Sequence, residues 1–178
     1  LHSLCQYTEM PCVTVPGKLR QLDAGSGEVY GVSDDRSVYF WHSNRWEQIK
    51  GNYLHVTVGP AGVWAVNNLN RVYRLQNFEW MQLSVPGKLR QLDAGSGEVY
   101  GVSDDDKVFF WHSNRWAQIA GNYSHVTVGP AGVWAVNRQN FVYRLQDFAW
   151  MHVSGLLKQI DAGGDTFLAG VNAADNIY

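Results

Sequence analysis

The sequence predicts an all-β protein, a β-propeller of five four-stranded blades, and three observations lead to this prediction. The stretch Val15–Met81 recurs as Val85–Met151 with only eleven changes, most of which swap charge or polarity as expected of solvent-facing positions. Each copy is itself double, because a tryptophan recurs 34, 36 and 34 positions apart, at Trp46, Trp80, Trp116 and Trp150. Turn residues divide every unit into short apolar runs, and no window has helical spacing.

The first unit illustrates the expected strands. They are Leu19–Ala24, Glu28–Ser33, Ser37–Trp41 and Trp46–Ile49, separated by Gly-, Asp-, Ser- and Asn-rich breaks. A sheet this small cannot bury both faces alone, so neighbouring sheets must cover them. A ring of such sheets is a propeller, and a linear stack of β-coils is the competing arrangement.

The five units are expected to form one domain, residues 1–178. Their approximate bounds are 12–43, 44–77, 78–113, 114–147, and 148–178 together with 1–10. The last unit stops at a position equivalent to Val72-Tyr73, whereas Leu1–Met10 aligns with Arg71–Trp80 at the end of a unit. We therefore expect the N-terminal strand Leu1–Gln6 to complete the last blade, which would remove exposed sheet edges. A six-bladed propeller whose chain is incomplete is the alternative.

Composition narrows the possible functions. The net charge is −2 and the basic residues are scattered, so we expect no nucleic-acid partner. No apolar run approaches the ~20 residues of a membrane span. The histidines form no H-E-x-x-H motif, and a site repeated in every unit argues against an enzyme, so we predict no catalytic residue, metal or cofactor. Calcium remains an option at Asp34-Asp35 and Asp104–Asp106, although these runs lack the ordered ligands of a calcium loop.

Two further features concern the cellular compartment. A disulfide between Cys5 and Cys12, or between one of them and a residue beyond the C-terminus, would fit a secreted protein. Two separate thiols fit the sequence equally well. Asn122-Tyr123-Ser124 is an N-glycosylation sequon. Its sister unit has Leu54 at the third position, so only one of the two copies can carry a glycan.

Several segments resemble tectonin repeats. They are the sequence that occurs at His55–Asn67 and again at His125–Asn137, and the segment Gly155–Gly164. The resemblance is to fish egg lectins and the tectonin-type tachylectins. It implies a secreted or egg-stored propeller lectin of innate defence. Such a lectin would bind N-acetylglucosamine and bacterial glycans such as lipopolysaccharide or peptidoglycan. The chain departs from this group in having five units and few cysteines. A protein-interaction scaffold without sugar binding is the alternative.

The alternation of strands should place the loops on two opposite faces. One face combines amides, carboxylates, phenols and imidazoles, a mixture suited to sugar hydroxyls and to the C–H side of a sugar ring. The candidate sugar-binding residues are Asp34, Asp35, Asn52, Tyr53, His55, Asn67, Asn70, Asp104, Asp105, Asn122, Tyr123, His125, Asn137 and Asn140. Turns also need Asn and Asp, so each has a structural explanation as well. The opposite face carries Trp41, His42, Asn44, Arg45 and their copies Trp111, His112, Asn114 and Arg115, for which core packing beside a solvated loop is the simpler explanation.

Overall fold

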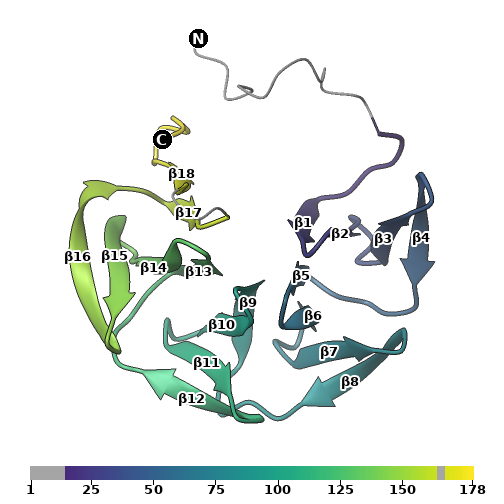
Figure 1. Ribbon diagram of the computed structural model, residues 1–178, viewed down its shortest axis with the longest axis horizontal. Helices are drawn as coiled ribbons and strands as arrows, with labels where there is room; N and C mark the ends of the chain where they lie inside the picture. Colours follow the sequence, from purple (N-terminus) through teal and green to yellow (C-terminus); the bar gives the residue numbers. More distant parts are fainter. Residues whose placement is uncertain (1–14, 164–166) are drawn as a thin grey trace.

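The computed structural model describes residues 15–163 and 167–178, and within these ranges all the regular elements are β-strands. The strands form four four-stranded antiparallel sheets and one two-stranded sheet, each built from strands consecutive in the chain. The sheets follow one another around a central axis, with the first strand of each innermost (Figure 1). The predicted all-β propeller is therefore confirmed, as four complete blades and a partial fifth.

The strand bounds follow the repeat. Blade 1 contains β1 (Gln21–Gly25), β2 (Glu28–Val32), β3 (Val38–His42) and β4 (Arg45–Ile49). Blade 2 contains β5 (His55–Gly59), β6 (Gly62–Val66), β7 (Val72–Gln76) and β8 (Glu79–Leu83). Blade 3 contains β9 (Leu89–Gly95), β10 (Glu98–Ser103), β11 (Val108–His112) and β12 (Arg115–Ile119). Blade 4 contains β13 (His125–Gly129), β14 (Gly132–Val136), β15 (Phe141–Gln146) and β16 (Ala149–Leu156), and blade 5 contains β17 (Gln159–Asp161) and β18 (Ala169–Val171).

The inner strands approach one another as closely as their backbones allow. A glycine ends each of the first four inner strands, and a Cβ atom there would overlap a carbonyl oxygen of the next blade. The glycines are Gly25, Gly59, Gly95 and Gly129, and they face the carbonyls of Val58, Ala94, Val128 and Ala162. Only a residue without a side chain permits this approach.

The hydrophobic core lies between adjacent blades. Trp64 of β6 is fully buried and packs edge-on against Trp111 and Trp116 of blade 3, with ring centroids 5.5 and 6.0 Å apart. The equivalent Trp134 faces the partial fifth blade and is less buried. Tryptophans therefore pack between blades at the junction of blades 2 and 3.

The last unit contains a short hairpin extended by a bridge between Val171 and Ile177. Figure 1 shows β17–β18 and β1–β2 at the two ends of the arc of described strands. The predicted completion of this blade by Leu1–Gln6 lies outside the described residues, as does the Cys5–Cys12 disulfide. No helix in the described part of the chain has the length and hydropathy of a membrane span.

Candidate functional site

The turns lie on two faces, as expected. The face that we call the Gly-turn face carries the two-residue hairpin loops that end β1, β3 and their counterparts, such as Ser26-Gly27 and Ser43-Asn44. The opposite face, which we call the Asp-turn face, carries the turns 33–37 and 67–71, the connection 50–54 and their copies in blades 3 and 4.

On the Asp-turn face of blade 1, the turn 33–37 contacts the connection 50–54 through two predicted residues, Asp35 and Asn52. The carboxylate of Asp35 accepts hydrogen bonds from the Ser33 hydroxyl and from the backbone N–H of Ser37, the latter at 3.2 Å. These hydrogen bonds, that of Ser33 first, lower the pKa of the Asp35 carboxyl. Asn52 donates from its amide to the Asp35 carbonyl at 3.5 Å, and Asp34 is exposed in the same turn.

The predicted asparagines of blade 2 divide into two roles. Asn67 holds its own turn, because its side-chain oxygen accepts from the N–H groups of Leu69 and Arg71, each at 3.0 Å. Asn70 adopts a left-handed backbone with φ 57° and donates from its amide to Asp104 of blade 3 at 2.6 Å. The structure thus brings two predicted residues from different blades into contact.

The predicted tyrosines and histidines turn their rings inward, away from the surface of this face. Tyr53 is 6% exposed, and its ring packs 4.6 Å from the Trp80 ring and 5.1 Å from the Tyr73 ring. Tyr123 is equally buried in the second copy, and burial raises its pKa to about 12. The phenol rings are therefore engaged in packing, and His55 and His125 point into a central channel instead.

The second copy has the same turns, and the new side-chain contact among its predicted residues is at Asn122. Asp105 accepts from the Ser103 hydroxyl at 2.6 Å, and Asn137 holds its turn as Asn67 does. Asn140 is again left-handed, with φ 67°. The side chain of Asn122 is exposed, and its oxygen accepts from the Lys107 ammonium at 2.5 Å.

A cluster in blades 3 and 4 has no counterpart in the first copy. Asp106 is 9% exposed and pairs with Arg90 at 2.9 Å and with Arg138. Although burial opposes ionisation, the two guanidinium groups hold the pKa of Asp106 below its usual value. The first copy has Arg36 in place of Asp106, so this position is not the solvent-facing site that the charge swap suggests.

A cavity of about 240 Å³ opens between blades 2 and 3 beside Asn70. Its lining combines amides, a hydroxyl and cations, namely Asn70, Gln82, Ser84, Arg71 and Lys88. Polar groups that converge on a small hollow are typical of ligand sites, where they fix orientation through hydrogen bonds.

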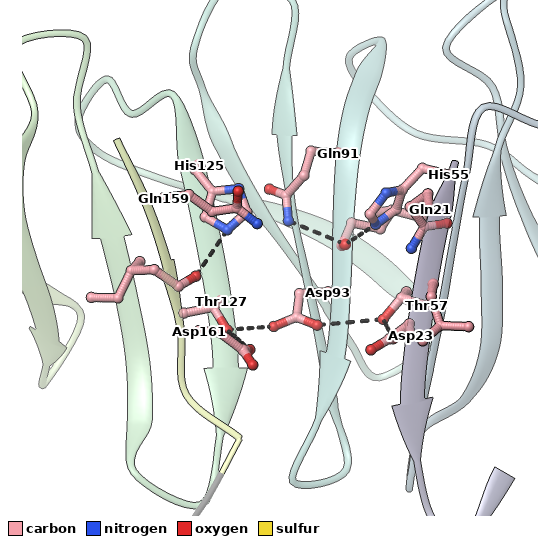
Figure 2. Close-up of a pocket in the computed structure, with 13 residues that line it drawn as sticks. Gln21, Asp23, His55, Thr57, Gln91, Asp93, His125, Thr127, Gln159 and Asp161 are labelled. Atoms are coloured by element: carbon pink, nitrogen blue, oxygen red, sulfur yellow. Dashed lines mark hydrogen bonds between the residues drawn. The ribbon is translucent and has the colours of Figure 1, made fainter. Parts of the chain in front are cut away.

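The central channel forms a second hollow, of about 230 Å³, lined by the inner strands (Figure 2). Figure 2 shows two layers of polar side chains, one of glutamine and histidine and one of aspartate and threonine. The two types alternate from blade to blade, as Gln21 and Asp23, His55 and Thr57, Gln91 and Asp93, His125 and Thr127, Gln159 and Asp161.

These side chains link inner strands that belong to different sheets. Thr127 donates to the Asp93 carboxylate at 2.7 Å, the Val128 N–H donates to the same oxygen at 2.7 Å, and one ring nitrogen of His125 lies 3.0 Å from the Ile160 carbonyl oxygen. Burial raises the pKa of Asp93 to about 6 and lowers that of His125 to about 4. The channel residues therefore act as connectors between blades.

The channel residues other than the histidines were not anticipated as a group. Their signal is the alternation of Gln-Leu-Asp with His-Val-Thr, which places both polar side chains of a strand on one side because they are two residues apart. Among the described residues, no group of three or more His, Cys, Asp or Glu side chains is placed to hold a metal ion.

Comparison with known proteins agrees with this architecture. The family model described as the tectonin domain matches residues 18–95 and 88–178. The fish-egg lectin of Cyprinus carpio is 31% identical over 95% of this chain and 79% of its own length. Tectonin-1 of Physarum polycephalum is 36% identical over 36% of this chain and 28% of its own length.

Solved structures agree on the fold at much lower identity. The WD40 β-propeller domain of Doa1 superimposes with a TM-score of 0.69 and 14% identity, covering 93% of this chain and 66% of that domain. Prp20p of Saccharomyces cerevisiae gives 0.72 and 9%, covering 90% of this chain and 57% of its own. The chain thus spans less than two thirds of each solved propeller. The repeat, the blades and the family match together establish that this chain belongs to the tectonin family.

Proposed function

We propose that this protein is a lectin that binds N-acetylglucosamine-type sugars on microbial surfaces, such as lipopolysaccharide or peptidoglycan, in innate defence. The observation that carries the proposal is the cavity beside Asn70, where groups from blade 2 and from the connection 84–88 to blade 3 converge on about 240 Å³. The name of the carp relative, a fish-egg lectin, supports a sugar as the ligand and a secreted or egg-stored protein.

The groups around this cavity match the chemistry of a sugar. The amides of Asn70 and Gln82 and the hydroxyl of Ser84 can each donate and accept, as sugar hydroxyls do. The cations Arg71 and Lys88 would in addition favour the phosphate and carboxylate groups of bacterial glycans. Asn70 is held in place by its hydrogen bond to Asp104, which reduces the ordering cost of binding.

Repeated sites compensate for weak binding at each single site. A single shallow site of this kind would bind a monosaccharide poorly, but a surface that carries many sugars engages several sites at once. The other predicted residues of the turns on the Asp-turn face, such as Asp34, Asn52 and Asn140, are proposed to form such additional contacts, whereas a glycan on Asn122 would obstruct the site at that position.

Two measurements test the proposal. Isothermal titration calorimetry measures the affinity for free N-acetylglucosamine, and a binding assay measures the affinity for albumin that displays this sugar. We expect millimolar binding of the monosaccharide and much tighter binding of the displayed form. Asn70→Ala should weaken both, whereas Asn68→Ala in the same turn serves as the matched control. Absence of binding at tens of millimolar N-acetylglucosamine would contradict the proposal.

Secretion has a separate test. We propose that Asn122 carries an N-glycan when the protein is expressed in a secreting eukaryotic cell, because its side chain is exposed in a connection between blades. A peptide-N-glycosidase should then reduce the mass of the secreted protein, and Asn122→Gln should remove that difference. A secreted product with the unmodified mass would argue against this modification.

A further inference from the structure

The Gly-turn face contains two exposed phenylalanines in an unusual backbone conformation. Phe78 and Phe148 are 66% and 69% exposed, and each is the second residue of a two-residue loop between the outer strands of an even-numbered blade. Their φ angles are 62° and 60°. A bulky side chain rarely occupies this left-handed region, which is best suited to Gly, Asn and Asp.

The same chain shows what this turn ordinarily uses. The corresponding loops of the odd-numbered blades end in Asn44 and Asn114, with φ 63° and 58°. The turn geometry is therefore unchanged, and asparagine satisfies it without strain. The aromatic ring in the even blades is not required by the turn, and an observed strained residue at a surface is a reasonable starting point for a functional hypothesis.

The surroundings of each ring form a platform. Phe78 lies 5.7 Å from the ring of Phe40 in blade 1, and Phe40 lies 5.9 Å from the imidazole of His42. Tyr30 stacks on Phe40 with ring centroids 5.9 Å apart, and it is 4% exposed. The row thus rises from the core between two blades to a ring open to solvent, with an exposed imidazole nearby.

The second copy reproduces this arrangement. Phe148 lies 5.7 Å from Phe110, which lies 6.2 Å from His112 and 5.8 Å from Tyr100. The junction between blades 2 and 3 differs, because tryptophans pack there and the adjacent loop is Ser113-Asn114. The face therefore presents two equal platforms rather than one continuous apolar surface.

We propose that Phe78 and Phe148 are stacking platforms for the apolar C–H face of a hexopyranose of the N-acetylglucosamine type, with His42 and His112 as hydrogen-bonding neighbours. A lone exposed ring beside a polar side chain fits a sugar, which is apolar on one face and polar at its rim. A protein partner would instead favour a larger contiguous apolar patch. This inference rests on the proposed function and adds a second contact surface, opposite to the cavity beside Asn70.

The test compares two matched double variants. Phe78→Asn with Phe148→Asn installs the residue found in the equivalent loops, so the variant is expected to fold, whereas Phe78→Tyr with Phe148→Tyr keeps the rings. We expect the asparagine variant to lose at least ten-fold in affinity for albumin that displays N-acetylglucosamine and the tyrosine variant to bind within two-fold of the original protein. Circular dichroism and thermal unfolding confirm folding.

A direct readout uses protein labelled with 4-fluorophenylalanine, whose two relevant fluorine resonances are assigned by Phe78→Asn and Phe148→Asn. Titration with methyl β-N-acetylglucosaminide should shift these two resonances. If the protein binds the sugar, but the asparagine variant retains full affinity and the two resonances do not move, the platforms are wrong and the proposed function stands. If the unmodified protein binds no sugar at all, both proposals fail.

Discussion

The inner and outer halves of the blades differ in how they tolerate change. The first two strands of every blade are identical in the two long copies, whereas all eleven differences fall in the third and fourth strands and in the turns and connections beside them. The glycine that ends each of the first four inner strands contacts the next blade backbone to backbone, so a side chain has no room at that position. In the outer half, which contains all the differences, a substitution can be accommodated by solvent or compensated by a second substitution.

The compensated change is Arg36→Asp106. It places a carboxylate in a nearly buried position, where Arg90 already points and where Asn68→Arg138 supplies a second cation. Two of the eleven differences thus fall on residues that pair with each other. The comparison teaches that the outer half also contains coupled positions, which sequence similarity alone does not reveal.

The largest effect is expected from filling an inner contact. Gly59→Ala puts a Cβ atom onto the Ala94 carbonyl oxygen, and neither backbone can move without disturbing its sheet. We expect a loss of about 3 kcal/mol or more in the free energy of unfolding, measured by urea denaturation. Gly163→Ala is the control, since the nearest atom to its Cβ among the described residues is Oδ2 of Asp161 at 3.4 Å. Equal losses for both variants would refute the distinction.

Breaking the ion cluster should come next. Asp106→Ala leaves the partly buried Arg90 without its carboxylate, and we expect a loss of about 1–2 kcal/mol. Arg36→Ala at the equivalent position of the first copy should cost less than about 0.5 kcal/mol.

The coupling itself can be measured by rebuilding the first-copy pair. Asp106→Arg should be strongly destabilising alone, and the addition of Arg138→Asn should recover part of that loss. A double-mutant cycle with urea denaturation gives the coupling energy. Additive effects would mean that the two positions are not energetically coupled.

The channel predicts a pH dependence with two opposing contributions. The pKa of His125 is lowered from 6.5 to about 4, so the unfolded chain binds a proton first and this contribution to stability is lost as the pH falls from 6.5 toward 4. The pKa of Asp93 is raised from 3.8 to about 6, so the folded state binds a proton first and stability is gained over nearly the same range.

Two variants separate these contributions. His125→Gln installs the residue of the odd-numbered blades and should reduce the loss between pH 7 and pH 4.5 by about 1–2 kcal/mol. Asp93→Asn removes the opposing gain and should make the loss steeper. Urea midpoints at several pH values measure both, and an unchanged slope in His125→Gln would mean that the imidazole titrates normally.

The sequence alone predicts the blades well, because their period, turns and alternating strands are local features. In blade 1 the observed strands begin and end within two residues of the expected ones. The candidate site is harder to predict from the sequence, because tertiary packing places its residues in different environments. Asn70 and Asp104 meet across blades, but Tyr53 is used to pack against Trp80, and His55 turns toward the channel. The arrangement of the blades around the ring determines which side of a strand faces a neighbouring blade. The sequence of a single unit does not encode this arrangement.

The smallest effect on stability is expected at the strained turn of the outer half. Phe78→Asn removes the contact with Phe40, but it also removes the strain of a bulky residue in left-handed backbone. Since the two effects oppose each other, we expect the free energy of unfolding to change by no more than about 1 kcal/mol. The reverse exchange, Asn44→Phe, introduces the strain where no ring is needed and should destabilise by about 1 kcal/mol. Thermal and urea unfolding of both variants measure this. If Asn44→Phe were instead stabilising, the ring would favour the turn by itself, and the outer half would owe its phenylalanines to folding and not to binding.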